Sequence, residues 1–325
     1  MLNIRTTLIS AVLKTSFIKI FFTSALLFSL NTYSESNVTT VYVAEKAKNY
    51  VTNLFNDAKD KAVDGFEKTV VRETDFTHLE ISIGQDIFDL GGLTNNTKTK
   101  AEAIGVYRLH EDDSKFIFNQ TSLVNYNNRR TVNLGIGARE INDDETIIFG
   151  GNVFYDYELD SNHDRLGFGL EYITSVGEMR FNKYKALSKT INHKNIDEAA
   201  LDGHDFDIRY NLPYLYSSSI FYNNGKWEDG AGYEVKTKQW GLKVEPVSNL
   251  HLSVASQKQD SNASKTVSSL SYVIPFGKQQ ENKTMQDGKF TTKLQNVRKE
   301  IYKPVKRENR IMKKSIKLGV TASGY

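Results

Sequence analysis

Apolar and polar residues alternate with a period of two along residues 146–172, in two runs joined by a polar turn. Side chains in a β-strand point alternately to opposite faces, so this pattern predicts two strands with one apolar and one polar face. The apolar face is rich in aromatic residues and comprises Ile147, Phe149, Val153, Tyr155 and Tyr157 on the first strand and Leu166, Phe168, Leu170 and Tyr172 on the second. The polar face carries charges and glycines, and its lumen-facing candidates are Asn152, Asp156, Glu158, Arg165 and Glu171. Each run approaches the ~9–11 residues that a tilted strand needs to cross a bilayer, so we expect lipid on one side and water on the other.

Similar segments continue through residues 78–276, where we count about twelve strand candidates. Residues 130–139, 205–211 and 239–245 alternate with the same regularity. The pattern therefore predicts an all-β fold, a transmembrane antiparallel β-barrel of about twelve strands with an apolar outside and a polar lumen. An even number of strands places both ends of the barrel on the same side of the membrane.

The lengths of the predicted connections agree with this topology, because outer-membrane barrels have short periplasmic turns and longer outside loops. If the first strand runs outward, the short connections near residues 110–115, 141–146 and 246–249 are periplasmic. The longer segments, residues 188–204 and 223–238, then lie outside.

Composition fits a barrel better than a helical membrane protein. Hydrophobic residues make up 39% of the 325-residue chain and the mean hydropathy is -0.47, as expected when only one face of each strand is apolar. Cysteine is absent, which excludes disulfides and thiolate metal sites.

Two segments precede the predicted barrel. Residues 1–34 begin with Arg5, Lys14 and Lys19 and contain a short apolar run at residues 20–30, so they are predicted to be a secretory signal peptide. In residues 35–77 apolar side chains recur three or four positions apart, which predicts an amphipathic periplasmic helix. This helix is either a spacer or a docking surface.

The chain beyond the barrel is strongly basic. In residues 277–303 an apolar stripe of Phe290, Leu294, Val297 and Ile301 ends at Pro304 and predicts a short pore or periplasmic helix. Residues 304–325 form a basic linker, and the stretch 289–317 carries eleven Lys or Arg against two Glu. A basic segment and an acidic lumen attract each other, so we expect the tail to plug the pore; a solvated tail that binds lipopolysaccharide is the alternative.

The last predicted strand places aromatic and apolar residues on one face and ends at Phe276. Tyr272, Ile274 and Phe276 resemble the C-terminal signal that the bacterial barrel-assembly machinery reads. The alternative is that the aromatic residues belong only to the interface belt.

Few residues suggest chemistry. His163, Asp164 and Arg165 fall in a predicted tight outside turn, and we interpret them as solvated rather than as a catalytic or metal site. His193, His204, Asp205 and Asp207 offer ligand atoms for a divalent cation, but only the last three are close in sequence. The glycines at 135, 137, 150, 151, 167 and 169 alternate within strands, where we expect them to make room in a crowded lumen or for strand coiling. We predict no enzyme, no cofactor, no metal and no nucleic-acid partner.

Several segments resemble the membrane domain of the intimin/invasin family, the inverse autotransporters of Gram-negative bacteria. The matching stretches are residues 117–139, 150–172, 203–214, 241–247 and 305–311. The resemblance implies a twelve-stranded barrel, a pore helix, and a pore linker at Val305, Lys306, Arg307, Glu308, Asn309, Arg310 and Ile311. It also implies a surface passenger for cell adhesion, which we expect to be minimal or missing here because the sequence ends at Tyr325.

The resulting prediction is an outer-membrane translocator and anchor that threads its C-terminal linker to the cell surface. The alternative is an outer-membrane channel or structural barrel that adheres through its loops. Expected partners are outer-membrane lipid and lipopolysaccharide, the barrel-assembly machinery and periplasmic chaperones; a host or cell-surface ligand is left open.

Overall fold

The computed structural model describes residues 76–88, 97–212, 217–247, 249–276, 294–317 and 320–322. The predicted signal peptide, the predicted helix before the barrel and the part of the predicted pore helix up to residue 293 lie outside the described residues. No helix in the described part of the chain is long and apolar enough to cross a membrane.

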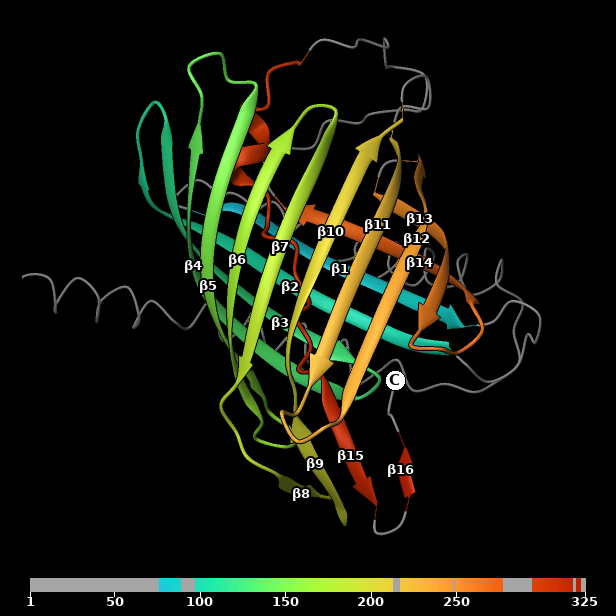
Figure 1. The fold of residues 1–325 in the computed structure, drawn as a ribbon. Coiled ribbons are helices and arrows are strands. Elements are labelled where there is room, and N and C mark those ends of the chain that lie inside the picture. The colour runs from blue at the N-terminus through green and yellow to red at the C-terminus, as the bar shows by residue number, and fades with distance from the viewer. Residues whose placement is uncertain are drawn as a thin grey trace, which may run out of the picture.

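Twelve antiparallel strands close into a barrel (Figure 1), which confirms the predicted fold class. The barrel strands follow one another in chain order, and β14 closes the cylinder by pairing with β1. Their bounds are β1 Phe76–Phe88, β2 Thr97–Glu111, β3 Lys115–Tyr126, β4 Arg129–Ile141, β5 Ile147–Glu158, β6 Asp164–Thr174, β7 Gly177–Ala186, β10 Asp202–Asn211, β11 Ser218–Glu228, β12 Glu234–Val247, β13 Leu250–Gln259 and β14 Lys265–Phe276. Closure leaves the cylinder without a free sheet edge, so that neighbouring strands pair the backbone groups of the wall, as a bilayer requires.

The two ends of the barrel differ. We call proximal the end at which β1 begins and β14 finishes, and distal the opposite end. The described proximal connections are short turns: residues 112–114, 142–146 and 175–176. At the distal end, β3 and β4 join through Asn127 and Asn128, which both have positive φ as a two-residue hairpin turn requires.

The longest distal connection carries a hairpin of its own. β8 (Ile191–His193) pairs with β9 (Ile196–Ala200) within the predicted outside segment 188–204. The predicted loop at residues 223–238 is wrong in length, because β11 continues to Glu228 and β12 begins at Glu234. The hydrogen-bonded ladder between these strands continues beyond the residues that alternate regularly, so the sequence pattern underestimates the lengths of the two strands.

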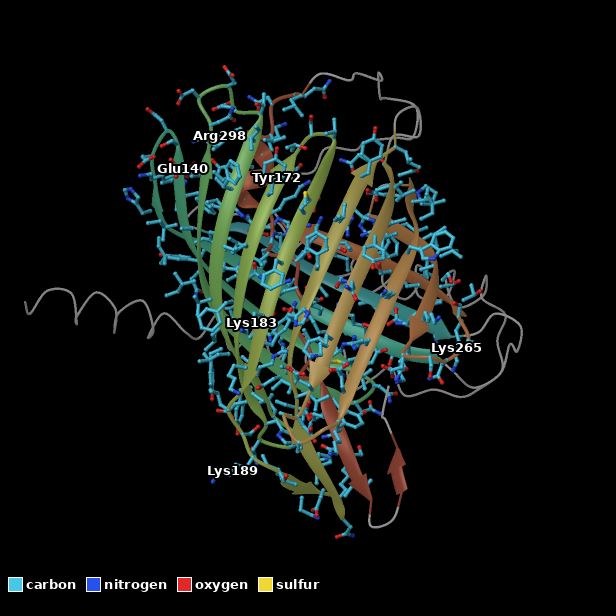
Figure 2. All side chains as sticks on the ribbon, in the orientation of Figure 1. Glu140, Tyr172, Lys183, Lys189, Lys265 and Arg298 are labelled. Atoms are coloured by element: carbon cyan, nitrogen blue, oxygen red, sulfur yellow. The ribbon has the colours of Figure 1, made fainter. Side chains whose placement is uncertain are left out.

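Side chains divide between the two faces of the wall as the alternation predicts (Figure 2). Phe149, Phe168 and Leu170 are 59%, 50% and 64% exposed on the outer surface, whereas Asp156 and Arg165 are fully buried inside. An outer face that is apolar and a charged interior fit a wall with lipid outside.

The C-terminal part of the chain lies inside the cylinder. A 3-10 helix, η2 (Arg298–Tyr302), sits at the proximal end, and residues 303–312 continue through the lumen toward the distal end (Figure 1). There β15 (Lys313–Lys317) adds to the open edge of β9, and β16 (Val320–Ala322) pairs with β15, which makes a second, four-stranded sheet. Within the described residues the predicted pore helix is therefore a single 3-10 element of five residues rather than a longer amphipathic α-helix.

Candidate functional site: the segment inside the barrel

Residues 294–312, which we call the linker segment, enter the barrel at its proximal end. The Val297 amide donates to the Glu145 carbonyl at 2.7 Å, and Arg298 donates to the carbonyls of Asp112 and Asp113. These acceptors belong to the β2–β3 and β4–β5 turns, so the entry point of the segment is fixed by the proximal turns.

An apolar cluster holds the first part of the linker segment. Val297, Ile301 and Val305 are at most 2% exposed. They pack against inward-facing residues of the wall, namely Val106, Phe116, Phe118, Ile141, Ile148, Phe154 and Ile173. This part of the lumen is thus a small hydrophobic core rather than a wet channel, and the η2 helix is held by burial of its apolar side.

Arg139 of β4 lies next to this cluster and contacts both the end of η2 and the buried carboxylate of Glu171. Its side chain is fully buried, donates to the Ile301 carbonyl at 2.8 Å and to the Lys303 carbonyl, and pairs with Glu171 at 2.9 Å. One guanidinium therefore satisfies two carbonyls that the end of η2 leaves without helical partners.

At the centre of the lumen, one carboxylate serves two arginines. Arg307 of the linker segment donates to both oxygens of Asp156 at 2.7 Å, and Arg165 donates to Asp156 Oδ2 at 2.7 and 2.9 Å. The three side chains are 0–1% exposed. We call Asp156, Arg165 and Arg307 the central triad. Bidentate arginine–carboxylate pairs are among the stronger polar contacts in proteins, so the triad fixes the segment against β5 and β6.

Aromatic and glycine residues shape the room around the triad. The Arg307 guanidinium lies over the Phe154 ring at 4.4 Å, and that of Arg165 lies over Tyr184 at 4.2 Å. A Cβ added to Gly167 would stand 2.6 Å from Arg307 Nη2. The expectation that lumenal glycines make room is confirmed at this position, since a larger residue would push the Arg307 guanidinium away from its place against the wall.

Neutral residues of the wall bind the backbone of the linker segment. The Val305 amide donates to Gln120 Oε1 at 2.7 Å, and the Glu308 amide donates to the Tyr184 hydroxyl at 2.9 Å. Asn133 donates to the Asn309 carbonyl at 3.0 Å. Asn133 lies on the polar face predicted for residues 130–139, whereas Gln120 and Tyr184 were not singled out from the sequence, although each stands at an inward position of its strand.

At the distal end, ion pairs surround the exit of the segment. Lys313 donates to both oxygens of Glu158 at 2.5 and 2.6 Å, and Arg129 pairs with Glu158 at 2.9 Å and with Glu198 of β9. Lys314 donates to Asp229 in the β11–β12 loop at 2.6 Å, and this hydrogen bond lowers the pKa of Asp229.

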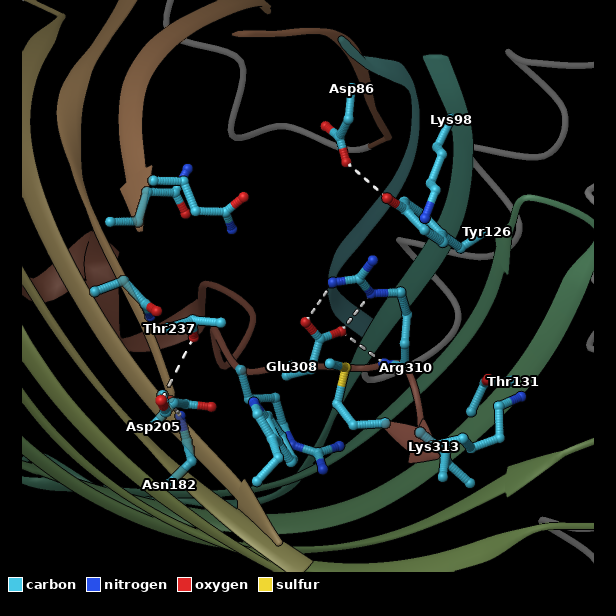
Figure 3. Close-up of a pocket in the computed structure, with 18 of the residues that line it drawn as sticks. Asp86, Lys98, Tyr126, Thr131, Asn182, Asp205, Thr237, Glu308, Arg310 and Lys313 are labelled. Atoms are coloured by element: carbon cyan, nitrogen blue, oxygen red, sulfur yellow. Dashed lines mark hydrogen bonds and ion pairs between the residues drawn. The ribbon is translucent and has the colours of Figure 1, made fainter. Parts of the chain in front are cut away.

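The linker segment follows one side of the lumen and leaves a hollow on the other. A cavity of about 590 Å³ lies beside the segment, lined by strands β10 to β14 and also by inward residues of the other strands, among them Asp86, Lys98 and Tyr126. Figure 3 shows Asp205 and Thr237 on the wall and the Glu308–Arg310 ion pair of the segment across from them. The wall of this cavity is rich in hydroxyl and amide groups, including Asn223, Thr237, Gln239, Ser253, Gln257 and Ser269.

The five predicted lumen-facing residues lie inside the barrel, with 0–7% exposure. Of these, Asp156, Arg165 and Glu158 contact the segment 294–317 directly, and Glu171 acts through Arg139. Asn152 is buried beside Gly169. The seven predicted linker residues, 305–311, all lie within the lumenal path.

The predicted assembly residues belong to the seam of the barrel. Tyr272, Ile274 and Phe276 pair in register with Ile83, Ile81 and Leu79 of β1. Their role in assembly stays a prediction.

The interpretation of His163 and Arg165 as solvated is wrong. Arg165 is part of the central triad, and His163, although it follows a turn, is fully buried with Nδ1 2.9 Å from the Ser188 hydroxyl. Ser188 of the β7–β10 connection lies against the His163 side chain, and burial lowers the pKa of His163, with Lys313 contributing. In the described part of the chain, no group of three or more His, Asp or Glu is placed to hold a metal ion.

A closed twelve-stranded barrel with an apolar outer surface and a segment of its own chain through the lumen is a β-barrel membrane protein with an internal plug. The chain belongs to the inverse autotransporter family: the model of its beta-domain matches residues 28–309. The family is one of bacterial outer-membrane barrels, so the protein is located in the outer membrane. The family is not an enzyme class.

Individual relatives are more distant. Invasin from Yersinia enterocolitica is 26% identical over 109 residues, which span 33% of this chain and 13% of invasin. The chain thus corresponds to a small part of that relative. A chain solved in work described as "Unveiling the Mechanism Behind the in-meso Crystallization of Membrane Proteins" is 17% identical, with a TM-score of 0.60 over 74% of this chain and 100% of that chain. The KdgM porin is 9% identical over 59% of this chain and 98% of its own, and its TM-score of 0.38 is too low to bear on the assignment.

Proposed function

We propose that the protein is an outer-membrane translocator and anchor of the inverse autotransporter type, which carries its C-terminal segment to the cell surface and holds it there. The observation that supports this most is the path of the linker segment. It begins among the proximal turns at Val297 and leaves the distal end at Met312, whose carbonyl accepts from Leu201 at 2.9 Å. With the short proximal turns in the periplasm, this path leads outward.

In this proposal the lumenal contacts are the anchor. The central triad, Arg139 and the ion pairs of Lys313 hold the segment at three heights of the barrel, so that whatever follows it stays attached to the wall. Residues 1–34 direct export, and Tyr272, Ile274 and Phe276 direct insertion by the assembly machinery, with periplasmic chaperones, lipid and lipopolysaccharide as the partners. Adhesion to a host or cell-surface ligand would belong to a passenger or to the distal loops.

The test is surface accessibility on intact cells. A peptide tag after Tyr325 is expected to be cleaved by added protease, as a tag inserted between Lys194 and Asn195 in the distal hairpin is. A tag inserted between Asp143 and Asp144 in a proximal turn is expected to be protected. Protection of the tag after Tyr325, with the hairpin tag cleaved, would refute outward threading.

A second candidate function is a diffusion channel or structural barrel with loop-mediated adhesion. The cavity of about 590 Å³ beside the linker segment favours it, because the segment does not fill the lumen. Planar-bilayer recordings of the whole protein separate the two: steady conductance with the tag after Tyr325 protected would favour the channel.

A further inference from the structure

The β8–β9 hairpin is not part of the barrel wall, and the edge of β9 that β8 leaves open meets the exiting chain. β15 pairs with this edge antiparallel, and the aligned residues are Lys313 with Ala200, Lys314 with Ala199, Ser315 with Glu198 and Ile316 with Asp197. The hairpin thus offers a preformed template, to which an extended segment adds as a further strand.

The register of this added strand is fixed at its start. The Leu201 amide donates to the Met312 carbonyl at 2.9 Å, which makes these residues a hydrogen-bonded pair. Such pairs alternate along an antiparallel ladder, so Ala199 and Lys314 form the next hydrogen-bonded pair. The Ala199 amide therefore points at the exiting strand and not at β8.

Charged side chains from the distal ends of β4 and β5, from β9 and from the β11–β12 loop surround the same strand. Arg129 holds Glu198 on β9, Lys313 reaches Glu158, and Lys314 reaches Asp229. An apolar contact supports them, in which Met312 packs with the buried cluster of Tyr184, Leu201 and Trp227. The surface is complementary to an extended, basic segment that emerges from the lumen.

We propose that the β8–β9 hairpin is a strand-capture site, which takes up residues 313–317 as they leave the barrel and prevents them from sliding back. This inference rests on the proposed function, because capture needs an exported segment. The captured strand also gives the following residues a fixed register, and β16 continues the sheet from it.

The first test is a crosslink, for which the absence of native cysteine leaves a clean background. Cysteines at Ala199→Cys and Lys314→Cys face each other as a hydrogen-bonded pair, whose Cα separation of about 5.5 Å suits a disulfide. We expect this pair to oxidise on intact cells. Ala199→Cys with Lys317→Cys is the matched control, since three residues of strand displace the partner by about 10 Å.

The second test disables capture. Ala199→Pro removes the amide that faces the Lys314 carbonyl, and Ala263→Pro places the same substitution at an exposed position of the β13–β14 loop at the same end. With the tag after Tyr325, we expect Ala199→Pro to lower the protease-accessible fraction at least twofold and Ala263→Pro to leave it unchanged. Heat-modifiable migration in gels reports that both barrels are folded.

The outcomes separate the two proposals. If the wild-type tag is protected, outward threading fails. If the wild-type tag is accessible but the Ala199/Lys314 pair does not crosslink, or Ala199→Pro matches Ala263→Pro in accessibility, capture by the hairpin fails while the translocator stands.

Discussion

The central triad allows a quantitative prediction about how firmly the linker segment is held. Asp156→Asn keeps the size of the side chain but removes the one negative charge that Arg165 and Arg307 share. Two buried guanidinium groups then face a neutral amide, and loss of one partner of a buried ion pair costs ~3–5 kcal/mol.

Only part of this free-energy cost changes the equilibrium between barrels that hold the linker segment and barrels that it has left. Arg165 belongs to the wall and remains in the barrel when the segment leaves, whereas Arg307 leaves with the segment and reaches water. If the two arginines share the cost equally, ~1.5–2.5 kcal/mol favours departure, which raises the ratio of open to plugged barrels about 10- to 70-fold.

Single-channel recording in planar bilayers measures this ratio as the frequency of open events. Asp205→Asn is the matched control, because Asp205 is also buried in the lumen but bonds to Asn182 and Tyr184, two neutral groups of the wall, at 2.8 and 2.7 Å. We expect frequent open events in Asp156→Asn and few in Asp205→Asn. Arg307→Gln added to Asp156→Asn tests the coupling, since the second substitution should cost less than it does alone.

Equal open-event frequencies in folded Asp156→Asn and Asp205→Asn would refute the reasoning. The segment would then be held by the apolar cluster and the distal sheet, and the triad would contribute only to the wall.

Three further predictions concern the plug, the lipid face and the distal turn. Truncation after Phe276 is expected to give a steadily conducting barrel with higher conductance than the full chain in planar bilayers, and an unchanged conductance would contradict the plug. Phe168→Arg places a charge on the lipid face at mid-strand and is expected to destabilise the barrel by ~2–4 kcal/mol in urea titrations. Phe168→Leu should cost less; equal losses of stability would contradict the assignment of Phe168 to the lipid face. Burial lowers the pKa of His163 below its usual 6.5, so the unfolded chain binds a proton at higher pH than the folded barrel; the stability that His163 contributes is complete above about pH 6.5 and is lost as the pH falls through the lowered value. The urea midpoint should therefore fall more between pH 7.5 and 5 in the wild type than in His163→Asn, and parallel falls would exclude His163 as the source.

The alternation of apolar and polar residues was sufficient to predict the wall. Each wall residue faces either lipid or lumen, and these two environments differ so strongly that the period of two survives in the sequence, as at Phe168 and Glu171. The same rule is insufficient within the lumen, because it treats the interior as uniformly wet. Phe118 and Phe154 point inward, and they do so because the linker segment supplies apolar partners there.

The pore helix shows a different limit. The spacing of Leu294, Val297 and Ile301 is compatible with a helix, and burial of Val297 and Ile301 is what the stripe predicts. The described structure has one 3-10 turn, closed by hydrogen bonds from Glu300 to Val297 and from Lys303 to Glu300. The turn ends before Pro304, where Arg139 binds the free carbonyls. The local sequence does not show that these carbonyls accept from a side chain, or that Arg139 is the donor.

Contacts between the linker segment and the wall depend on residues far apart in the chain. Arg307 and Asp156 are 151 positions apart, and the lumen offers several acidic and basic side chains, so charge alone predicts attraction without choosing a partner. The structure shows which partners are used: charged and aromatic contacts to the segment come from β2 to β7, whereas β10 to β14 present mainly hydroxyl and amide groups to the cavity. One side of the barrel therefore binds the segment, and the cavity lies on the other side. This division explains how the lumen can bind a basic segment tightly at Arg307 although the segment does not fill it.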